Sequence, residues 1–129
     1  MTPLTIHDLL MESADKRAQE FPPTTQMLAN ADNLLKQINA LQEIMNIQFS
    51  VSSGYRPGPY NKAARGAANS PHLTCEAIDL HDEHGIIKYK LQSNQIYLIT
   101  YKLYMETPSN TPTWCHLQTR PTHSRIFIP

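Results

Sequence analysis

The feature that most constrains this chain is a stretch rich in turn-forming and small residues, positions 52–79, which ends in an Asp seven positions after a His. These two residues are His72 and Asp79, and the later run Trp114-Cys115-His116 adds a second His. Two imidazoles and one carboxylate are a common ligand set for a catalytic zinc ion, which keeps a fourth position open for water. The rest of the chain is therefore interpreted as a scaffold around His72, Asp79 and His116.

Length and charge limit the other possibilities. With 129 residues, the chain is expected to form one domain, with N-terminal helices over residues 1–46 and a metal-site core over residues 47–129. Its 11 basic and 11 acidic residues balance without blocks of like charge, which argues against broad attraction to nucleic acid or anionic membranes. No run is long enough for a membrane span, and the N-terminus lacks a leader pattern. We therefore expect a protein that is soluble and cytoplasmic as synthesised.

Two helices are predicted before residue 46. Thr5-Ile6-His7-Asp8 is typical of a capped helix start; the apolar positions of this helix extend to Ala18, and Pro22-Pro23 ends it. The second helix follows Thr24-Thr25, where apolar residues recur at the spacing of one buried helical face. Met residues at this spacing belong to cores far more often than to cofactor sites, so we interpret this helix as the one that backs the sheet. Its stripe consists of Met27, Leu28, Ala31, Leu34, Leu35, Ile38, Leu41 and Met45.

The remainder of the chain predicts a small sheet with short connections. A rigid loop of turn formers is expected at 54–59, followed by a short helix over 60–65 that Gly66 closes. Residues 86–100 have apolar side chains at helical spacing, and although parts of this segment would suit strands, we favour a helix. The C-terminal residues 126–129 are expected to pack on the body of the protein. The predicted strands are residues 47–52, 76–80, 102–106 and 114–118.

The two cysteines, Cys75 and Cys115, lie beside the candidate ligands in the sequence. Two cysteines are not a disulfide framework, and thiols stay reduced in a cytoplasmic protein, so we interpret both as small buried packing residues. The alternatives are a disulfide that joins the two site segments and Cys75 as an additional metal ligand.

Three motifs together resemble one known family. They are SGYR at residues 53–56, NSPHLTCEAID at residues 69–79 and WCHL at residues 114–117. In this order they resemble the M15 group of zinc peptidases, which includes D-alanyl-D-alanine carboxypeptidases, dipeptidases and phage endolysin peptidases that cut bacterial peptidoglycan peptides. The resemblance covers residues 47–118. It implies an α+β domain of the hedgehog-like peptidase fold, in which helices back a small antiparallel sheet and one zinc ion lies at one face.

The resemblance also assigns roles to single residues. It implies that His72, Asp79 and His116 bind the zinc ion, which lowers the pKa of its bound water to about 7. It implies further that Arg56, in the SGYR segment, grips the substrate, and that Ser70 adds a hydrogen bond to it. A guanidinium on a proline-stiffened loop is suited to orienting a carboxylate or a carbonyl. The alternative for Arg56 is a structural tie between loops.

The general base is where this chain departs from the family. Many members have a Glu three residues before the last His, and here that position is Thr113. A hairpin with Glu106 opposite Trp114 would put Glu106 on the face of His116, where it can take a proton from the zinc-bound water. A register slip of one residue would turn Glu106 away. The poorer candidates for the base are Glu76 and Glu83.

The remaining positions near the motifs are expected to be structural. His81 shares strand parity with Asp79 and is a second-choice ligand. Cys75 stands where the family commonly has Gly, which removes no ligand. The other histidines are expected at the surface, and they are His7, His84 and His123.

The expected function is zinc-dependent hydrolysis of a peptide bond in peptidoglycan or its precursors, by a D,D-carboxypeptidase, dipeptidase or endolysin-type endopeptidase. The expected partner is a stem peptide or a D-Ala-D-Ala-like peptide, bound by a monomer that has no nucleic-acid or membrane partner. Action on the cell wall would need release by a separate pore protein. The alternatives are a non-catalytic phage structural or binding module that retains the zinc-peptidase fold, and a metal-free interaction domain.

Overall fold

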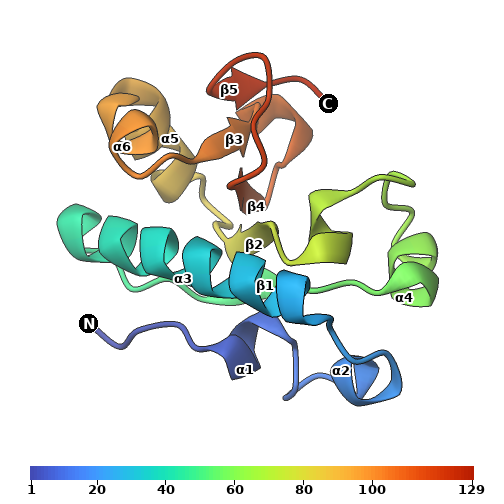
Figure 1. Cartoon of the computed structure of the whole chain (residues 1–129). Coiled ribbons are helices and arrows are strands. Elements are labelled where there is room, and N and C mark those ends of the chain that lie inside the picture. Colours follow the sequence, from blue (N-terminus) through green and yellow to red (C-terminus); the bar gives the residue numbers. More distant parts are fainter.

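The computed structural model describes residues 1–129 and has an α+β architecture, which confirms the predicted fold class. Its five strands form one sheet in the order β1-β2-β4-β3-β5. The long helix α3 crosses the middle of the molecule, with the N-terminal helices on one side of it and α5, α6 and strands β3 to β5 on the other (Figure 1). The strands are β1 (Val51–Ser53), β2 (Ala77–His81), β3 (Tyr104–Glu106), β4 (Trp114–Gln118) and β5 (Ile126–Phe127), and the α-helices are α1 (Ile6–Leu9), α2 (Arg17–Glu20), α3 (Thr25–Met45), α4 (Gly58–Ala63), α5 (Ile86–Ser93) and α6 (Ile96–Thr100).

The first predicted helix is two short helices, α1 and α2, which corrects the prediction of one. The capping box at Thr5 and Asp8 forms as predicted. After α1 the chain turns at Met11, whose φ of 60° is left-handed and stops the helix. Asp15 then accepts a hydrogen bond from the backbone N–H of Arg17 at 3.0 Å, so a side chain replaces the helical carbonyl partner there.

Helix α3 has the predicted start and the predicted buried face. Thr24 caps it by accepting a hydrogen bond from the backbone N–H of Met27 at 3.2 Å. The prediction is wrong for Leu28, which lies near the start of the helix and is 40% exposed. The helix ends at Met45 and is followed by Asn46, whose left-handed conformation is one that asparagine tolerates well. The buried apolar residues of the stripe are Ala31, Leu34, Leu35, Ile38, Leu41 and Met45.

Strand β2 lies at the centre of the site-bearing half of the sheet. It pairs antiparallel with β1 and with β4, and the β2–β4 register places Asp79 directly opposite His116. Strand β4 has the bounds predicted for it, Trp114–Gln118. Strand β1 is shorter than predicted because the backbone N–H of Phe49 donates to Gln42 Oε1 at 3.0 Å, which takes that residue out of the strand pairing.

The C-terminal half differs from the prediction in three places. The helix predicted over residues 86–100 is two helices, α5 and α6, because the chain leaves helical geometry at Asn94 (φ −136°, ψ 65°). Strand β3 begins at Tyr104 rather than at residue 102, since Lys102 has a left-handed φ of 54°. The last residues form β5, which pairs parallel with β3, so the sheet is mixed and not wholly antiparallel.

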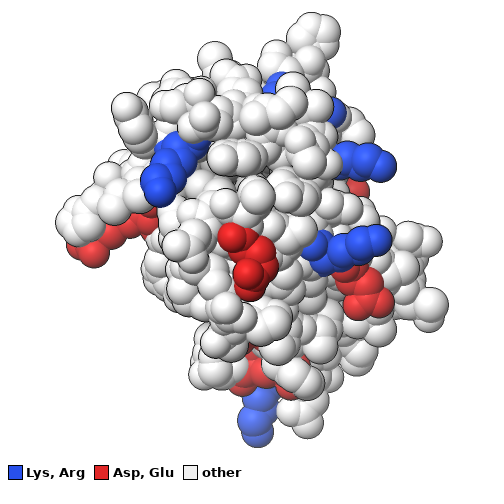
Figure 2. All heavy atoms as spheres, turned by 90° about the vertical axis from the view of Figure 1, so that its left-hand side faces the viewer, with Lys and Arg blue, Asp and Glu red and all other residues white.

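The surface agrees with the balanced composition. On the face shown in Figure 2, basic and acidic side chains are interspersed and neither sign forms a continuous field. None of the helices combines the length and the apolar character that crossing a bilayer would require.

Candidate metal centre

Three side chains from two strands and one 3-10 helix meet at the β2–β4 pair. His116 Nδ1 lies 2.8 Å from Asp79 Oδ1, and His72 Nε2 lies 3.3 Å from Asp79 Oδ2. One ligand atom from each residue lies within 4.8 Å of the others, and all three residues are buried. His72, Asp79 and His116 therefore form a group that can hold a metal ion.

His72 is held in place by contacts with Ser70 and Gly54. It lies in the 3-10 helix Pro71–Thr74, which Ser70 caps by accepting a hydrogen bond from the backbone N–H of His72 at 3.2 Å. Its ring Nδ1 lies 2.8 Å from the carbonyl oxygen of Gly54. Since a carbonyl only accepts, the Nδ1 atom carries the proton, and the lone pair of Nε2 faces Asp79.

The electrostatics of Asp79 and His72 suit a cation. Burial alone raises the pKa of Asp79, but the hydrogen bonds and charges of His116 and His72 outweigh burial and leave that pKa well below its ordinary value. Burial lowers the pKa of His72, which favours its neutral form. Burial also lowers the pKa of His116, but the hydrogen bond to Asp79 and its charge reverse the effect and raise that pKa. An ionised carboxylate between two imidazoles is a donor set that fits zinc.

The group opens into a hollow of about 370 Å³ that also contains the other predicted site residues. Arg56 and Ser70 line one part of it, and the guanidinium Nη2 lies 3.5 Å from Ser70 Oγ. The Nε atom of Arg56 is buried and has no hydrogen-bond partner. Buried polar groups normally have partners, so this unpartnered donor is an exception in the fold.

Glu106 also lines the hollow, although its register differs from the predicted one. The pairs Tyr104↔Gln118 and Met105↔Leu117 bring Glu106 level with His116 and not with Trp114. This shift of two residues keeps the side chain on the predicted face, since strand side chains alternate with period two. Burial raises the pKa of Glu106, with a further increase from Asp79 and an opposing effect from His116.

The family of the chain follows from the greater part of its sequence. The Peptidase M15 family model matches residues 3–96. The chain belongs to the Peptidase M15 family. The match includes Arg56, Ser70, His72 and Asp79, whereas His116 lies after it. None of the curated proteins matches the sequence.

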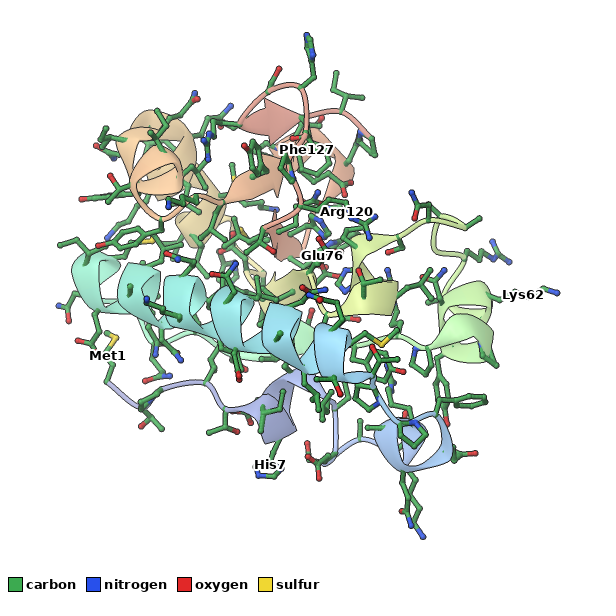
Figure 3. All side chains as sticks on the ribbon, in the orientation of Figure 1. Met1, His7, Lys62, Glu76, Arg120 and Phe127 are labelled. Atoms are coloured by element: carbon green, nitrogen blue, oxygen red, sulfur yellow. The ribbon has the colours of Figure 1, made fainter.

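Other polar residues of this M15 chain lie outside the candidate metal centre. Glu76 forms an ion pair with Arg120 at 3.0 Å, and Figure 3 shows the two side chains next to each other. Glu83 is exposed, as is His81, which the structure does not bring to the group. The remaining histidines are also exposed, and His7 extends away from the body (Figure 3); these are His7, His84 and His123.

The cysteines are free and buried in the M15 fold, as in the packing interpretation, and they form no disulfide. Cys75 is also not in the metal-binding group. Its φ of 60° is left-handed, a conformation that favours glycine. This geometry accounts for the glycine that we expect at this position in other members of the family.

Two residues of the hollow that lie next to His116 were absent from the predicted site residues. Gln118 lines it from β4, and Phe127 lines it from β5 with its ring centroid 6.0 Å from that of His116. The sequence contained a signal for Gln118, because it lies two residues after His116 and residues two apart on a strand share a face. No pattern identifies Phe127, since a strand of two residues has no readable periodicity.

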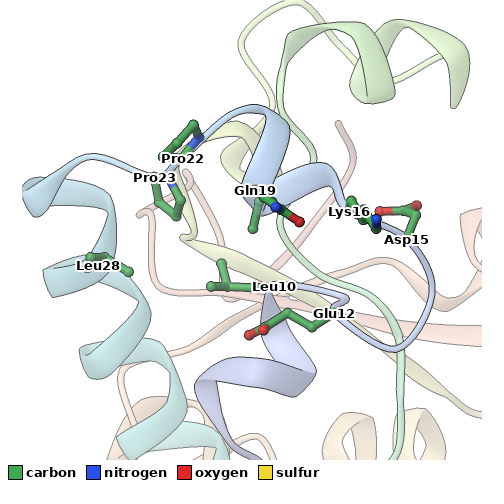
Figure 4. A pocket seen from close by; sticks show the side chains of 9 residues that line it. Leu10, Glu12, Asp15, Lys16, Gln19, Pro22, Pro23 and Leu28 are labelled. Carbon is green, nitrogen blue, oxygen red and sulfur yellow. The ribbon is translucent and has the colours of Figure 1, made fainter.

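A larger hollow lies elsewhere and has a different lining. About 710 Å³ in volume, it lies between α1, α2 and the start of α3 (Figure 4). Leu10, Pro22 and Leu28 are among its lining residues, and it contains no histidine or cysteine. Size therefore does not identify the functional site here, whereas the chemistry of the side chains does.

Proposed function

We propose that this M15 chain is a zinc-dependent peptidase that hydrolyses a peptide bond in bacterial peptidoglycan or in its precursor peptides. The observation that carries the proposal is the convergence of His72, Asp79 and His116 in a hollow that Arg56 and Glu106 also line. Membership of the Peptidase M15 family supports peptidase chemistry. The choice of peptidoglycan follows from the resemblance of the three sequence motifs.

The three converging residues would hold the zinc ion. When bound, zinc supplies a Lewis acid and a water molecule whose pKa is lowered to about 7. The role of the chain is to orient the ligand atoms before the ion binds. The carboxylate of Asp79 is ionised, and the hydrogen bond to Gly54 turns the Nε2 lone pair of His72 toward Asp79. These fixed orientations reduce the cost of ordering the ligands when the ion binds.

Glu106 would act as the general base. Its carboxylate lies at the hollow, level with His116, where it can accept a proton from the attacking water and pass it to the leaving amine. A raised pKa suits this exchange, because a base whose pKa is closer to neutrality both accepts and releases a proton readily. The position of Glu106 favours an enzyme over the non-catalytic binding module.

Arg56 and Ser70 would hold the peptide. The Arg56 guanidinium and the Ser70 hydroxyl lie next to each other in the lining of the hollow, where they would bind a carboxylate or carbonyl oxygen of the substrate. A hollow of about 370 Å³ accommodates a short peptide segment, not a folded protein. Stem peptides and D-Ala-D-Ala-like peptides have this size and carry such oxygens.

The test combines metal analysis with digestion. We expect about one zinc ion per chain, and we expect purified peptidoglycan to give shortened stem peptides detectable by mass spectrometry. His116→Ala should lose most of the metal and all measurable digestion, whereas His123→Ala should retain both because His123 is exposed and outside the group. Equal zinc retention in the two variants would contradict the ligand assignment.

A further inference from the structure

Gln118 contacts His116 on the side of the ring that faces away from Asp79. It lies two residues after His116 on β4 and is 4% exposed. Its Oε1 lies 2.7 Å from His116 Nε2, while its own Nε2 donates to the carbonyl oxygen of Arg120 at 2.8 Å. Both ends of a buried amide are therefore engaged, one with a candidate ligand and one with the backbone.

The identity of the atoms follows from the Arg120 carbonyl. A carbonyl oxygen only accepts hydrogen bonds, so the NH₂ end of Gln118 must face it, and the oxygen end must face His116. An amide oxygen also only accepts, so His116 Nε2 must carry a hydrogen. The other ring nitrogen, Nδ1, then points toward Asp79 Oδ1 at 2.8 Å.

His72 shows the opposite arrangement. Its Nδ1 is occupied by the carbonyl oxygen of Gly54, and its Nε2 faces Asp79. The two imidazoles thus turn different nitrogens to the same carboxylate, each because a different acceptor occupies the other nitrogen.

Arg120, whose carbonyl oxygen accepts a hydrogen bond from Gln118, is itself held in place by its side chain. The Arg120 guanidinium donates to Glu76 Oε1 at 3.0 Å and to the Asn69 carbonyl at 2.7 Å. Arg120 therefore links the end of β4 to the segment that precedes His72, and these contacts hold its backbone carbonyl within hydrogen-bond distance of Gln118.

The His116 ring is also held by its aromatic neighbours. The rings of His72 and Phe127 pack edge-on against it, with centroids 5.2 and 6.0 Å away.

We propose that Gln118 is a positioning residue, which fixes His116 with a hydrogen on Nε2 so that Nδ1 is the nitrogen presented to the metal. The inference rests on the proposed zinc centre and extends it to a residue that does not touch the ion. Partners of this kind orient metal-binding histidines, and their loss typically weakens metal affinity about 10–100-fold.

The experiment compares two buried glutamines. Gln118→Met removes the acceptor with little change in volume, whereas Gln118→Glu keeps an acceptor oxygen. The control is Gln42→Met, since Gln42 is 1% exposed and donates to the carbonyl of Thr2 at 2.9 Å in a different part of the fold. Zinc affinity is measured by competition with a chromophoric chelator, and the His116 ring nitrogens are observed by ¹⁵N NMR with and without zinc.

We expect Gln118→Met to bind zinc about 10–100-fold more weakly than the wild type and to lose the slowly exchanging Nε2–H signal of His116. Gln118→Glu should bind zinc more tightly than Gln118→Met, and Gln42→Met should lower thermal stability without changing zinc affinity. Wild-type zinc affinity in Gln118→Met, or a wild-type His116 without a hydrogen on Nε2, would overturn the inference. If the wild-type chain binds no zinc, the proposed function fails, and the Nε2–H signal of the metal-free chain still decides the role of Gln118.

Discussion

Replacing Gly54 with Ala should damage both the fold and the candidate metal centre. A Cβ atom at this position would lie 2.1 Å from the carbonyl oxygen of Leu9 and 2.9 Å from its carbonyl carbon. Both contacts are to backbone, so no flexible side chain can move aside. Gly54 and its neighbour Tyr55 also form two hydrogen bonds. The Gly54 carbonyl oxygen accepts one from the His72 ring, and the Tyr55 N–H donates one to the Leu9 carbonyl oxygen at 2.8 Å.

The expected loss of stability follows from these contacts. Overpacking a tight site costs about 1–3 kcal/mol. Separating the two segments also weakens the Tyr55–Leu9 hydrogen bond, and an unsatisfied buried donor costs about 1–3 kcal/mol. Ala lowers the entropy of the unfolded chain, which offsets about 0.4–1 kcal/mol. The net loss is about 2–4 kcal/mol, or a decrease in Tm of roughly 10 °C for a domain of this size.

Thermal denaturation of the metal-free protein and zinc competition measure the two effects. Gly58→Ala is the matched control, because no atom lies within 4 Å of a Cβ at that position and the residue begins α4. The control should be neutral or slightly stabilising. The reasoning is refuted if Gly54→Ala retains the Tm and the zinc affinity of the wild type.

Four further predictions test the site and its surroundings. Glu106→Gln should retain zinc and lose about 10²–10⁴-fold in turnover. Because burial raises the pKa of Glu106, wild-type activity should fall as the pH drops through a value above the ordinary glutamate pKa, and the rate measured against pH should show this limb. Arg56→Lys keeps the charge but loses the planar fork, so assays should show little recovery of the activity lost in Arg56→Ala, at unchanged zinc content. Burial raises the pKa of Cys75 to about 12 and that of Cys115 well above its ordinary value, so a thiol reagent at pH 8 should label both only after denaturation.

The sequence predicted the elements that carry strong local signals. Helix α3 has a long apolar stripe and a capping Thr24, and β4 is a strand whose alternate residues include His116; both lie where the pattern indicated. The convergence of the ligand residues was predicted from their chemical type and order, which is information that does not depend on exact element bounds.

The misses have physical causes that local patterns do not contain. The left-handed turn at Met11 and the side-chain cap from Asp15 divide the first helix, although its apolar positions continue to Ala18. Strand β5 has two residues and forms because β3 offers an open edge, which is a property of the assembled sheet. The β3–β4 register, which positions Glu106, depends on the conformation of the loop at 107–113. The composition of this loop alone does not determine that conformation.

Under the proposed function, the pairing of Asp79 with His116 would link metal binding to the order of folding. The two residues come from strands separated by a long intervening segment, and bringing such distant segments together is the slow, entropically costly part of forming a sheet. A folding intermediate without β4 would contain His72 and Asp79 but only part of the donor set. A one-residue misalignment of β2 and β4 would place His116 on the face opposite to Asp79. Tight zinc binding would therefore stabilise only molecules whose two strands had aligned correctly. The ion would thus favour the native register of β2 and β4 over misaligned registers.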